Sequence, residues 1–303
     1  MNPAATLHRF IYLLRRLKAP YSYPSKQQMV AGLQDEGFQT STRTFERDIH
    51  TLQNEYGILI TYDRPKKGYC WKLPEDEDIG HFDTFLQLLE RKERLDFLSH
   101  AIGFDATRYL MLEQNNAFQG VEWLPQIWEA MQAKRVVQFT YQSYDKPKAS
   151  KRIVEPNLIV EDRNRWYLVG WDRQAADIRS FGLDRMENLQ LTAKIFTRDI
   201  RHTFREQKQQ IIGMTIFPKE PLTQVVLRFT ATEAPYVKAS PLHFSQKIVK
   251  ETKTHVDFAL EVKLNYELER DILGYGEEVE VLEPAQLREQ IKQRLQKSMN
   301  KYK

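Results

Sequence analysis

The sequence predicts an α+β protein of several domains, and three observations support this class. The chain has 303 residues, which is more than a single ordinary hydrophobic core accommodates. Apolar residues recur at helical spacing in the first quarter, whereas β-rich runs such as 166–171 and 256–264 dominate the second half. Hydrophobic residues make up 41% and charged residues 28%, as in folded soluble proteins. We therefore expect a helical head, a helical linker, a β-rich middle and a layered α/β tail.

Composition and segment lengths exclude several other classes. No apolar run approaches the roughly 18 residues of a membrane-spanning helix. The first residues lack an apolar signal core before a small-residue cleavage site, so we expect a cytoplasmic protein. The single cysteine, Cys70, excludes an intramolecular disulfide and a cysteine-rich zinc site. The net charge of +4 is too small to argue for nucleic-acid binding by itself.

The head divides into three helical patterns and a hairpin. The first pattern, from Leu7 to Leu17, ends before Pro20. A capping box at Ser25-Lys-Gln-Gln28 opens the second, which stops at Gly37. Ser41 is the predicted N-cap of a third helix that runs to Tyr56. Strand-like residues 58–62 and 68–73 then bracket a basic tip, Asp63-Arg-Pro-Lys-Lys67.

The third helix separates into two faces. At about 100° per residue, the apolar residues share one arc and a basic, polar set shares the opposite side. On an ordinary helix such a set is a solvated face, and Glu46 and Asp48 flank it. Three helices and a basic-tipped hairpin instead favour a winged helix, whose third helix enters the major groove while the wing contacts phosphates. The apolar arc is Phe45, Ile49, Leu52 and Tyr56, and the opposite stripe is Arg43, Arg47, His50 and Asn54.

The linker is marked by a change of charge. Residues 1–74 carry about five excess positive charges and residues 75–120 about six excess negative ones. The change falls at the acidic run Pro74-Glu-Asp-Glu-Asp78, which we interpret as a linker or helix start without a binding role. Residues 79–118 are predicted helical and are more apolar than an isolated helix pair can hide. We expect them to pack on the middle domain or on a second subunit.

The β-rich middle contains an unusual strand. Trp166 to Trp171 alternate between two faces, and the pleat should place Arg163, Arg165 and Tyr167 on one side. Two guanidinium groups beside a phenol suit phosphate or a nucleotide, although aromatic residues in strands usually pack in a core. In the next segment Arg179, Phe181 and Leu183 alternate with smaller or acidic residues. Either an anion lies between the arginines, or a carboxylate such as Asp184 satisfies them internally.

The tail has alternating strands and amphipathic helices. Apolar side chains alternate from Val256 to Leu264, as in a half-buried strand. A helix interrupted at Pro235 precedes it, and helices over 266–273 and 284–302 follow. This βαββαβ-like order predicts a ferredoxin-like layer.

The middle residues resemble a known family. Trp166-Tyr167-Leu168 is similar to the signature of the WYL domain, an SH3-like β-barrel of bacterial transcription regulators, and the similarity includes Arg152-Ile-Val-Glu-Pro156. It implies a basic, aromatic pocket for a nucleotide-like or nucleic-acid ligand. At Gly182 the family commonly has a long residue, so the pocket should be wider or less charged. Each arginine can instead pair with Asp145, Glu155 or Asp184. The ligand-binding residues that the resemblance implies are Tyr141, Arg152, Tyr167, Arg179, Phe181 and Arg185, and the strand pattern adds Arg165.

The head and tail resemble the usual neighbours of WYL domains. Segment 41–52 is similar to the recognition helix of a DeoR-type winged helix-turn-helix, and 67–73 to its wing. Segments 241–246 and 272–284 resemble the WCX extension. The implied domains are 1–74 for DNA binding, 75–122 as helical linker or dimerisation region, 123–202 as WYL domain and 203–303 as WCX dimerisation domain. The predicted DNA-binding residues are Ser41, Thr42, Arg43, Thr44, Arg47, His50, Arg64, Lys66 and Lys67.

A catalytic role is not expected. The seven histidines have no partner at metal-ligand spacing, and neither a Gly-rich phosphate loop nor a Gly-x-Ser-x-Gly elbow occurs. We therefore expect no cofactor, no metal and no enzyme activity. The favoured function is a homodimeric regulator that binds double-stranded operator DNA, without membrane contact, and responds to a nucleotide or single-stranded nucleic acid. Relatives imply a repressor of a phage-defence locus; the alternatives are an activator triggered by single-stranded DNA after DNA damage, or a non-catalytic interaction module.

Overall fold

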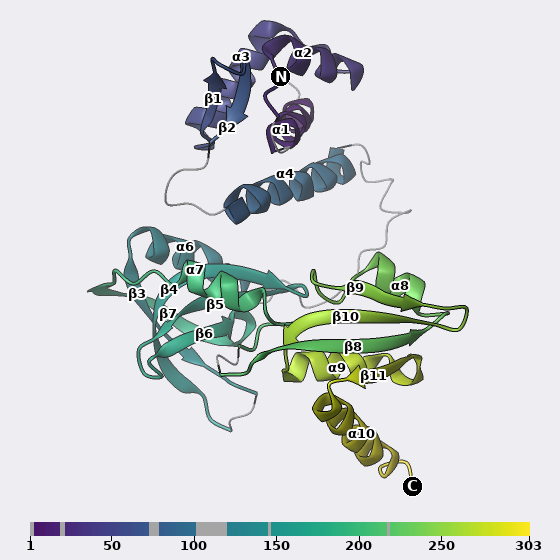
Figure 1. Ribbon diagram of the computed structural model, residues 1–303. Helices are drawn as coiled ribbons and strands as arrows, with labels where there is room; N and C mark the ends of the chain where they lie inside the picture. Colours follow the sequence, from purple (N-terminus) through teal and green to yellow (C-terminus); the bar gives the residue numbers. More distant parts are fainter. Residues whose placement is uncertain (1–2, 19–21, 73–78, 101–119, 145–146, 217–218) are drawn as a thin grey trace. The chain divides into compact units, whose positions relative to one another are not determined.

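The structure, a computed structural model, describes residues 3–18, 22–72, 79–100, 120–144, 147–216 and 219–303 (Figure 1). The chain divides into two compact units, Met1–Glu113 and Gln114–Lys303. The predictions for residues 101–118, for the acidic run 75–78 and for Asp145 lie outside the described residues. None of the described helices is long and apolar enough to cross a membrane.

The first unit has the three helices and the hairpin that the sequence predicts. Ser25 and Gln28 form a reciprocal capping box, and the Ser41 hydroxyl caps the third helix by accepting from the Thr44 amide at 3.2 Å. Both caps were predicted and are confirmed. The elements are α1 (Pro3–Lys18), α2 (Lys26–Asp35), α3 (Thr42–Asn54), β1 (Ile60–Asp63), β2 (Gly68–Trp71) and α4 (Ile79–His100).

Helix α4 packs on this head. Phe82, Leu86 and Leu89 belong to the same buried cluster as the apolar residues of α1, α2 and α3. The ring of Phe82 lies 4.2 Å from that of Trp71 in β2. The expectation that this helix packs on the middle domain or a second subunit is therefore wrong for its first half, because the head itself supplies the apolar partner. Side chains 94–100 lie outside the described part.

The expected helix, α6, comes early in the second unit. It is followed by an antiparallel five-stranded sheet with the strand order β6-β5-β4-β3-β7. We call residues 120–208 the middle domain. Its core combines apolar residues of α6 with the inner face of the sheet. The elements are η1 (Val121–Trp123), α6 (Leu124–Gln132), β3 (Arg135–Tyr141), β4 (Ser150–Asp162), β5 (Arg165–Asp172), β6 (Asp177–Gly182), η2 (Leu183–Arg185), β7 (Met186–Ile195) and α7 (Arg201–Lys208).

A two-residue turn joins β4 to β5. Asp162 pairs with Arg165 across the hairpin, and Arg163 and Asn164 both have positive φ, 51° and 61°. Positive φ at both central residues is the geometry of a type I′ hairpin turn. Arg163 is therefore a turn residue. The prediction that it shares a strand face with Arg165 and Tyr167 is wrong, because the strand begins only at Arg165.

Residues 219–303 form the tail domain. Its antiparallel sheet has the order β11-β8-β10-β9, and the element order agrees with the predicted βαββαβ pattern. Pro235 occupies the first turn of α8 and does not interrupt it, because a helix start needs no amide donor there. The SH3-like and ferredoxin-like classes stay predictions. The elements are β8 (Leu222–Thr230), α8 (Ala234–Ala239), β9 (Lys247–Glu251), β10 (His255–Lys263), α9 (Tyr266–Gly274), η3 (Gly276–Glu278), β11 (Val279–Glu283) and α10 (Ala285–Met299).

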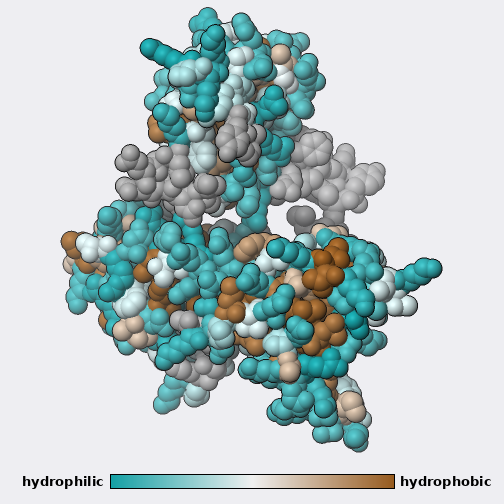
Figure 2. All heavy atoms as spheres, in the orientation of Figure 1, coloured by the Kyte–Doolittle hydropathy of each residue, from teal (hydrophilic) through white to brown (hydrophobic). Residues whose placement is uncertain are grey.

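Apolar side chains gather on part of the tail surface. In the view of Figure 2 they lie over the region of β9 and β10. Strand β9 is an edge of its sheet, and its Ile248 and Val249 are about half exposed. Exposed apolar residues on an edge strand are a surface that other chains can cover, although the flanking Lys247 and Lys250 limit uncontrolled pairing.

Candidate nucleic-acid interface and effector pocket

Helix α3 presents the basic stripe that the sequence predicts. Phe45 and Leu52 are completely buried, and the opposite residues Arg43, Arg47 and His50 are exposed. The amphipathic pattern thus anchors one face in the core and leaves the other open. Of the hydroxyl residues at the helix start, Ser41 and Thr42 are exposed and Thr44 is half-buried, all of them near free backbone amides of the first turn.

The acidic residues that flank this stripe are neutralised elsewhere. Asp48 is 2% exposed and accepts from Arg9 of α1 at 2.6 and 3.0 Å. Glu46 accepts from Lys26 of α2 at 2.5 Å, and this hydrogen bond raises the pKa of Lys26. Asp48 lies only 4.0 Å from Arg47, at the limit of an ion pair. The stripe therefore keeps its positive charge.

The tip of the β1–β2 hairpin is also basic. The Asp63 carboxylate accepts from the Lys66 backbone amide at 3.0 Å, which shapes the turn. The Lys66 ammonium lies 3.8 Å from the centre of the Tyr23 ring and donates to the Tyr23 hydroxyl, which raises the pKa of Lys66. Arg64 and Lys67 are exposed and form no ion pair with any described residue. The hairpin tip thus carries one cation held in place, Lys66, and two exposed cations, Arg64 and Lys67, that form no ion pair with a described residue.

The acidic helix α4 binds the cations of α1. Lys18 lies 2.6 Å from Asp83, Arg15 2.8 Å from Glu90, and His8 contacts Glu93. These pairs hold acidic side chains of α4 against α1, while Arg43 and Arg47 of α3 and the hairpin tip stay exposed.

In the middle domain two predicted arginines meet around one carboxylate. We call Tyr144, Arg165, Asp184 and Arg185 the arginine cluster. Arg165 donates to the Tyr144 hydroxyl at 2.9 Å and to Asp184. Burial lowers the pKa of Arg165, but these two hydrogen bonds outweigh it and raise that pKa overall. The Arg185 guanidinium lies 4.7 Å from the centre of the Tyr144 ring and 5.1 Å from that of Tyr141.

Two predicted tyrosines border the cluster. Tyr141 is 6% exposed, and its hydroxyl accepts from the Gly182 amide at 3.2 Å. Tyr167 is half-buried opposite Gly182 in the neighbouring strand. Burial raises the pKa of both phenols above the usual 10.0, while the nearby arginines oppose the shift. Both phenols are therefore neutral at physiological pH and can donate hydrogen bonds.

The space at Gly182 is filled by neighbouring side chains. A Cβ at this position would lie 2.5 Å from an Asp184 oxygen and 2.7 Å from an Arg185 nitrogen. The expectation of a wider or less charged pocket at Gly182 is wrong, because Asp184 and Arg185 lie where a longer side chain at this position would extend.

Three predicted ligand residues lie outside the cluster. Phe181 is 3% exposed and makes edge-on contacts with Phe139 and Tyr141, so it is a core residue and not a ligand contact. Arg152 is paired at 3.1 Å with the fully buried Asp172. Arg179 is exposed opposite Gly170, three residues along β6 from Gly182, and forms no ion pair within the described ranges.

Asp184, one of the acids considered from the sequence, is confirmed as the internal partner of Arg165 and lies 3.8 Å from Arg185, whereas Glu155 pairs with arginines outside the predicted set. Glu155 accepts from Arg173 at 2.8 Å and lies 3.8 Å from Arg198, whose guanidinium stacks 3.8 Å from the Trp171 ring. The sequence reasoning missed Tyr144, which follows β3 in an irregular segment without alternation. Its only available signal was its position three residues after the predicted Tyr141.

Comparisons with known proteins agree with this architecture. Residues 122–191 match the WYL domain and residues 221–299 the WCX domain. These two segments of the second unit are thus similar to a WYL domain followed by a WCX domain. Protein PafB of Mycobacterium tuberculosis and of Mycobacterium bovis is 29% identical over 171 residues, covering 55% of this chain and 49% of PafB. The chain spans about half the length of these curated relatives.

Two solved structures match the chain at low similarity. Proteasome accessory factor B/C (PafBC) of Arthrobacter aurescens matches with a TM-score of 0.33 and 22% identity, over 97% of this chain and 46% of that one. A structure described as a CRISPR Cas-related protein matches with a TM-score of 0.43 and 11% identity, over 99% of this chain and 85% of that one.

Proposed function

We propose that the chain is a sequence-specific transcription regulator that acts by binding DNA and not by catalysis. The observation that carries this proposal is the α3 face, on which Arg43 and Arg47 stay exposed while Asp48 and Glu46 are held by Arg9 and Lys26. A rigid helix with free guanidinium groups suits guanine edges and phosphates in a major groove. The basic hairpin tip supplies further phosphate contacts beside it.

The WYL domain is the proposed effector site. The arginine cluster combines two guanidinium groups and the Tyr144 ring, which can hold a phosphate and stack a base. Because Asp184 neutralises part of this charge, an anionic effector has to compete with a carboxylate. A nucleotide or a single-stranded nucleic acid has a phosphate that can compete with Asp184 for the arginines and a base that can stack on the Tyr144 ring.

Operator recognition by two copies completes the proposal. A homodimer would place two α3 helices on half-sites one or more DNA turns apart, so a change at the dimer interface changes affinity. The exposed apolar edge of the WCX domain supports self-association. We propose repression, released by the effector and directed at a phage-defence locus.

The test is a fluorescence-polarisation titration of the full chain against the DNA upstream of its own gene. Arg47→Ala should weaken duplex binding by roughly 1–3 kcal/mol, about 5- to 150-fold, because a base or phosphate contact is lost. Arg15→Ala is the matched control, since it removes an equal charge that Glu90 already neutralises. Equal losses of affinity in the two variants would show that α3 contributes to DNA binding only through its charge and not through a specific contact.

The same titration decides the direction of regulation. Added short single-stranded DNA should release the duplex if the protein is a repressor. Tighter duplex binding would instead support an activator triggered by single-stranded DNA. No duplex binding at low salt would overturn the regulator proposal and leave an interaction module.

A further inference from the structure

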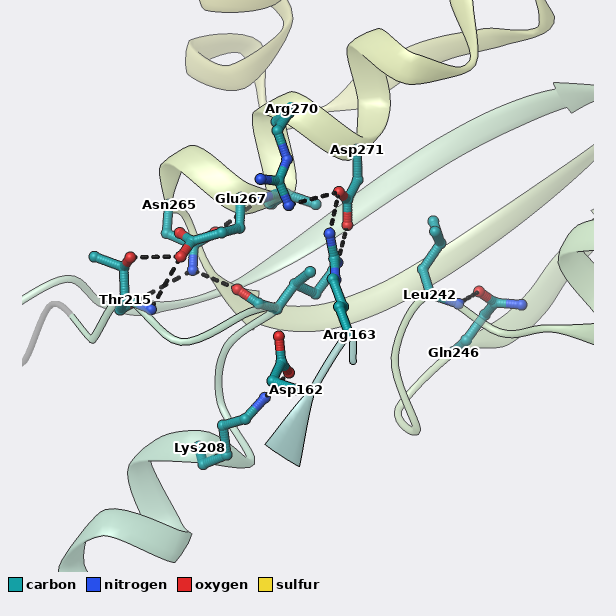
Figure 3. A network of polar contacts seen from close by, with 12 residues as sticks. Asp162, Arg163, Lys208, Thr215, Leu242, Gln246, Asn265, Glu267, Arg270 and Asp271 are labelled. Carbon is teal, nitrogen blue, oxygen red and sulfur yellow. Dashed lines mark hydrogen bonds and ion pairs between the residues drawn. The ribbon is translucent and has the colours of Figure 1, made fainter. Parts of the chain in front are cut away.

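The turn between β4 and β5 connects the WYL domain to the WCX domain. Arg163 donates from Nη1 to Oδ1 of Asp271 in α9 at 2.7 Å, and its second terminal nitrogen donates to Oδ2 (Figure 3). The pair is bidentate, which is the strong geometry for an arginine and a carboxylate. The hydrogen bonds to Asp271 raise the pKa of Arg163.

A cavity of about 540 Å³ lies beside this pair. Arg163 and Asp271 line it together with Arg270, Ser240 and Tyr275. The hollow is wide open to solvent, and its volume lies within the roughly 300–1,000 Å³ of small-molecule sites. Gly274, a further lining residue, has no other atom within 4 Å of the position of a Cβ, so the cavity is open there.

The cavity retains positive charge. Arg270 lies 3.8 Å from the same Asp271 oxygen and is about half exposed, so two guanidinium groups face one carboxylate (Figure 3). Of the nearby acids, Asp162 is paired with Lys208 at 3.2 Å, whereas Glu267 accepts from the neutral Thr215 amide at 3.1 Å and keeps its charge. An anion that enters therefore meets Arg270, which lies 3.8 Å from Asp271, and reaches Arg163 by displacing Asp271.

Hydrogen-bond donors complete the lining. Burial raises the pKa of Tyr275, with Glu233 and Asp271 adding to the shift, so its phenol stays protonated and can donate. The exposed Ser240 adds a hydroxyl. Two arginines, a phenol and a hydroxyl match the several acceptor oxygens of a phosphate group.

We propose that this cavity binds a phosphate monoester, which takes Arg163 from Asp271. A phosphate carries about −1.5 to −2 charges at neutral pH and three acceptor oxygens, so it can outcompete a carboxylate for the two guanidinium groups. A carboxylate ligand has the same charge as Asp271 and gains little by exchange. The open side at Gly274 accommodates the organic part of the ester.

Occupancy of this site would also affect the WYL domain. Arg163 and Arg165 flank Asn164 in the β4–β5 hairpin, and Arg165 belongs to the arginine cluster. Release of Arg163 frees the turn that fixes the start of β5. The proposal does not depend on DNA binding by the head and is tested without DNA.

The test is isothermal titration calorimetry of the full chain with inorganic phosphate, adenosine monophosphate and adenosine. Both phosphates should bind, the monophosphate more tightly, and adenosine should not. Arg270→Gln should weaken phosphate binding about tenfold or more, because a charge-assisted contact is lost. Asp271→Asn should strengthen it several-fold, since the competing charge is removed while the side-chain shape is kept.

Two further variants separate binding from structure. Arg288→Gln is the matched control, because Arg288 also pairs with a glutamate, Glu280 at 2.8 Å, but does not line the cavity. Gly274→Leu should bring the monophosphate down to the affinity of inorganic phosphate by filling the open side, with an unchanged unfolding temperature. The proposal is overturned if Asp271→Asn and Arg270→Gln weaken binding alike, or if neither phosphate binds at millimolar concentration.

Discussion

The arginines of helix α3 and those of the middle domain stand in opposite electrostatic situations. On α3 the exposed Arg43 and Arg47 have no acid closer than 4.0 Å among the described residues. In the WYL domain Arg165 is held by Asp184 and Arg152 by Asp172. The first arrangement is ready for a polyanion without rearrangement. In the second arrangement, a ligand would have to displace the carboxylate from its arginine before it could bind. Such a site suits a ligand-controlled switch better than a permanent binding surface.

The largest expected effect tests how the head keeps Asp48 of α3 away from the basic stripe of the same helix. Asp48→Ala leaves Arg9 buried, at 7% exposure, without its carboxylate. Removing one partner of a buried pair costs about 3–5 kcal/mol, so the first unit should unfold at clearly lower urea concentration. Glu46→Ala, which removes the neighbouring exposed acid, should leave the urea midpoint nearly unchanged. Equal midpoints would mean that Asp48 is not a stabilising partner.

The second-largest expected effect concerns the arginine cluster of the middle domain. Asp184→Asn should raise the affinity for single-stranded oligonucleotides by about fivefold, or ~1 kcal/mol, because Arg165 loses its competing carboxylate. Arg165→Gln should lower that affinity by a similar factor. Both changes can be followed by fluorescence polarisation with a labelled oligonucleotide. A decrease in the Asp184→Asn variant would contradict an exchange of carboxylate for ligand.

The hairpin tip offers a comparison between a fixed and a free cation. Lys66→Ala and Lys67→Ala should each reduce the slope of log affinity against log salt by about one, if each ammonium contacts a phosphate. The loss of affinity should be larger for Lys66, because Tyr23 already holds this side chain in place. The duplex titration is repeated at several salt concentrations. An unchanged slope in both variants would remove the hairpin from the DNA contact.

The smallest effect concerns alkaline pH. Burial raises the pKa of Tyr167 above 10.0, so the folded state favours the neutral phenol. This contribution is fully present below the unfolded pKa and is lost as pH rises through the folded one. Tyr167→Phe should therefore reduce the fall in unfolding temperature above about pH 10. A fall identical to that of the unchanged chain would show that another group causes it.

The head could be predicted in detail because its signals are local. Helix caps, the spacing of Phe45 and Leu52, and the basic tip lie within a few residues of the structure they determine. In the second unit Asp184 could be named as an arginine partner, because it lies in the same short segment as Arg179 and Arg185, but Asp172 and Asp271 could not be predicted this way. Asp172 is 20 residues from Arg152, and Asp271 is 108 residues from Arg163, so only the folded sheets bring them together.

The turn between β4 and β5 shows a second limit of prediction from the sequence. Alternation from Arg163 to Tyr167 suggested one continuous strand, and no glycine marked the turn. Arg163 and Asn164 adopt positive φ without one, and the apparent strand face divides into a turn and a strand. The expectation for Gly182 was wrong for a different reason. The missing side chain suggested empty space, but the side chains of Asp184 and Arg185 fill that space.

The ion pairs between α1 and α4 have a consequence for how the protein meets DNA. With a net charge of only +4, the whole chain would be drawn weakly to a polyanion. Asp83 and Glu90 offset Lys18 and Arg15 of α1, while the α3 stripe and the hairpin tip keep exposed cations, so the head has an uneven field. If the head binds DNA as proposed, such a field would turn it during diffusion so that encounters begin with α3 facing the duplex, and this orientation would weaken once salt shortens the screening length to about 10 Å.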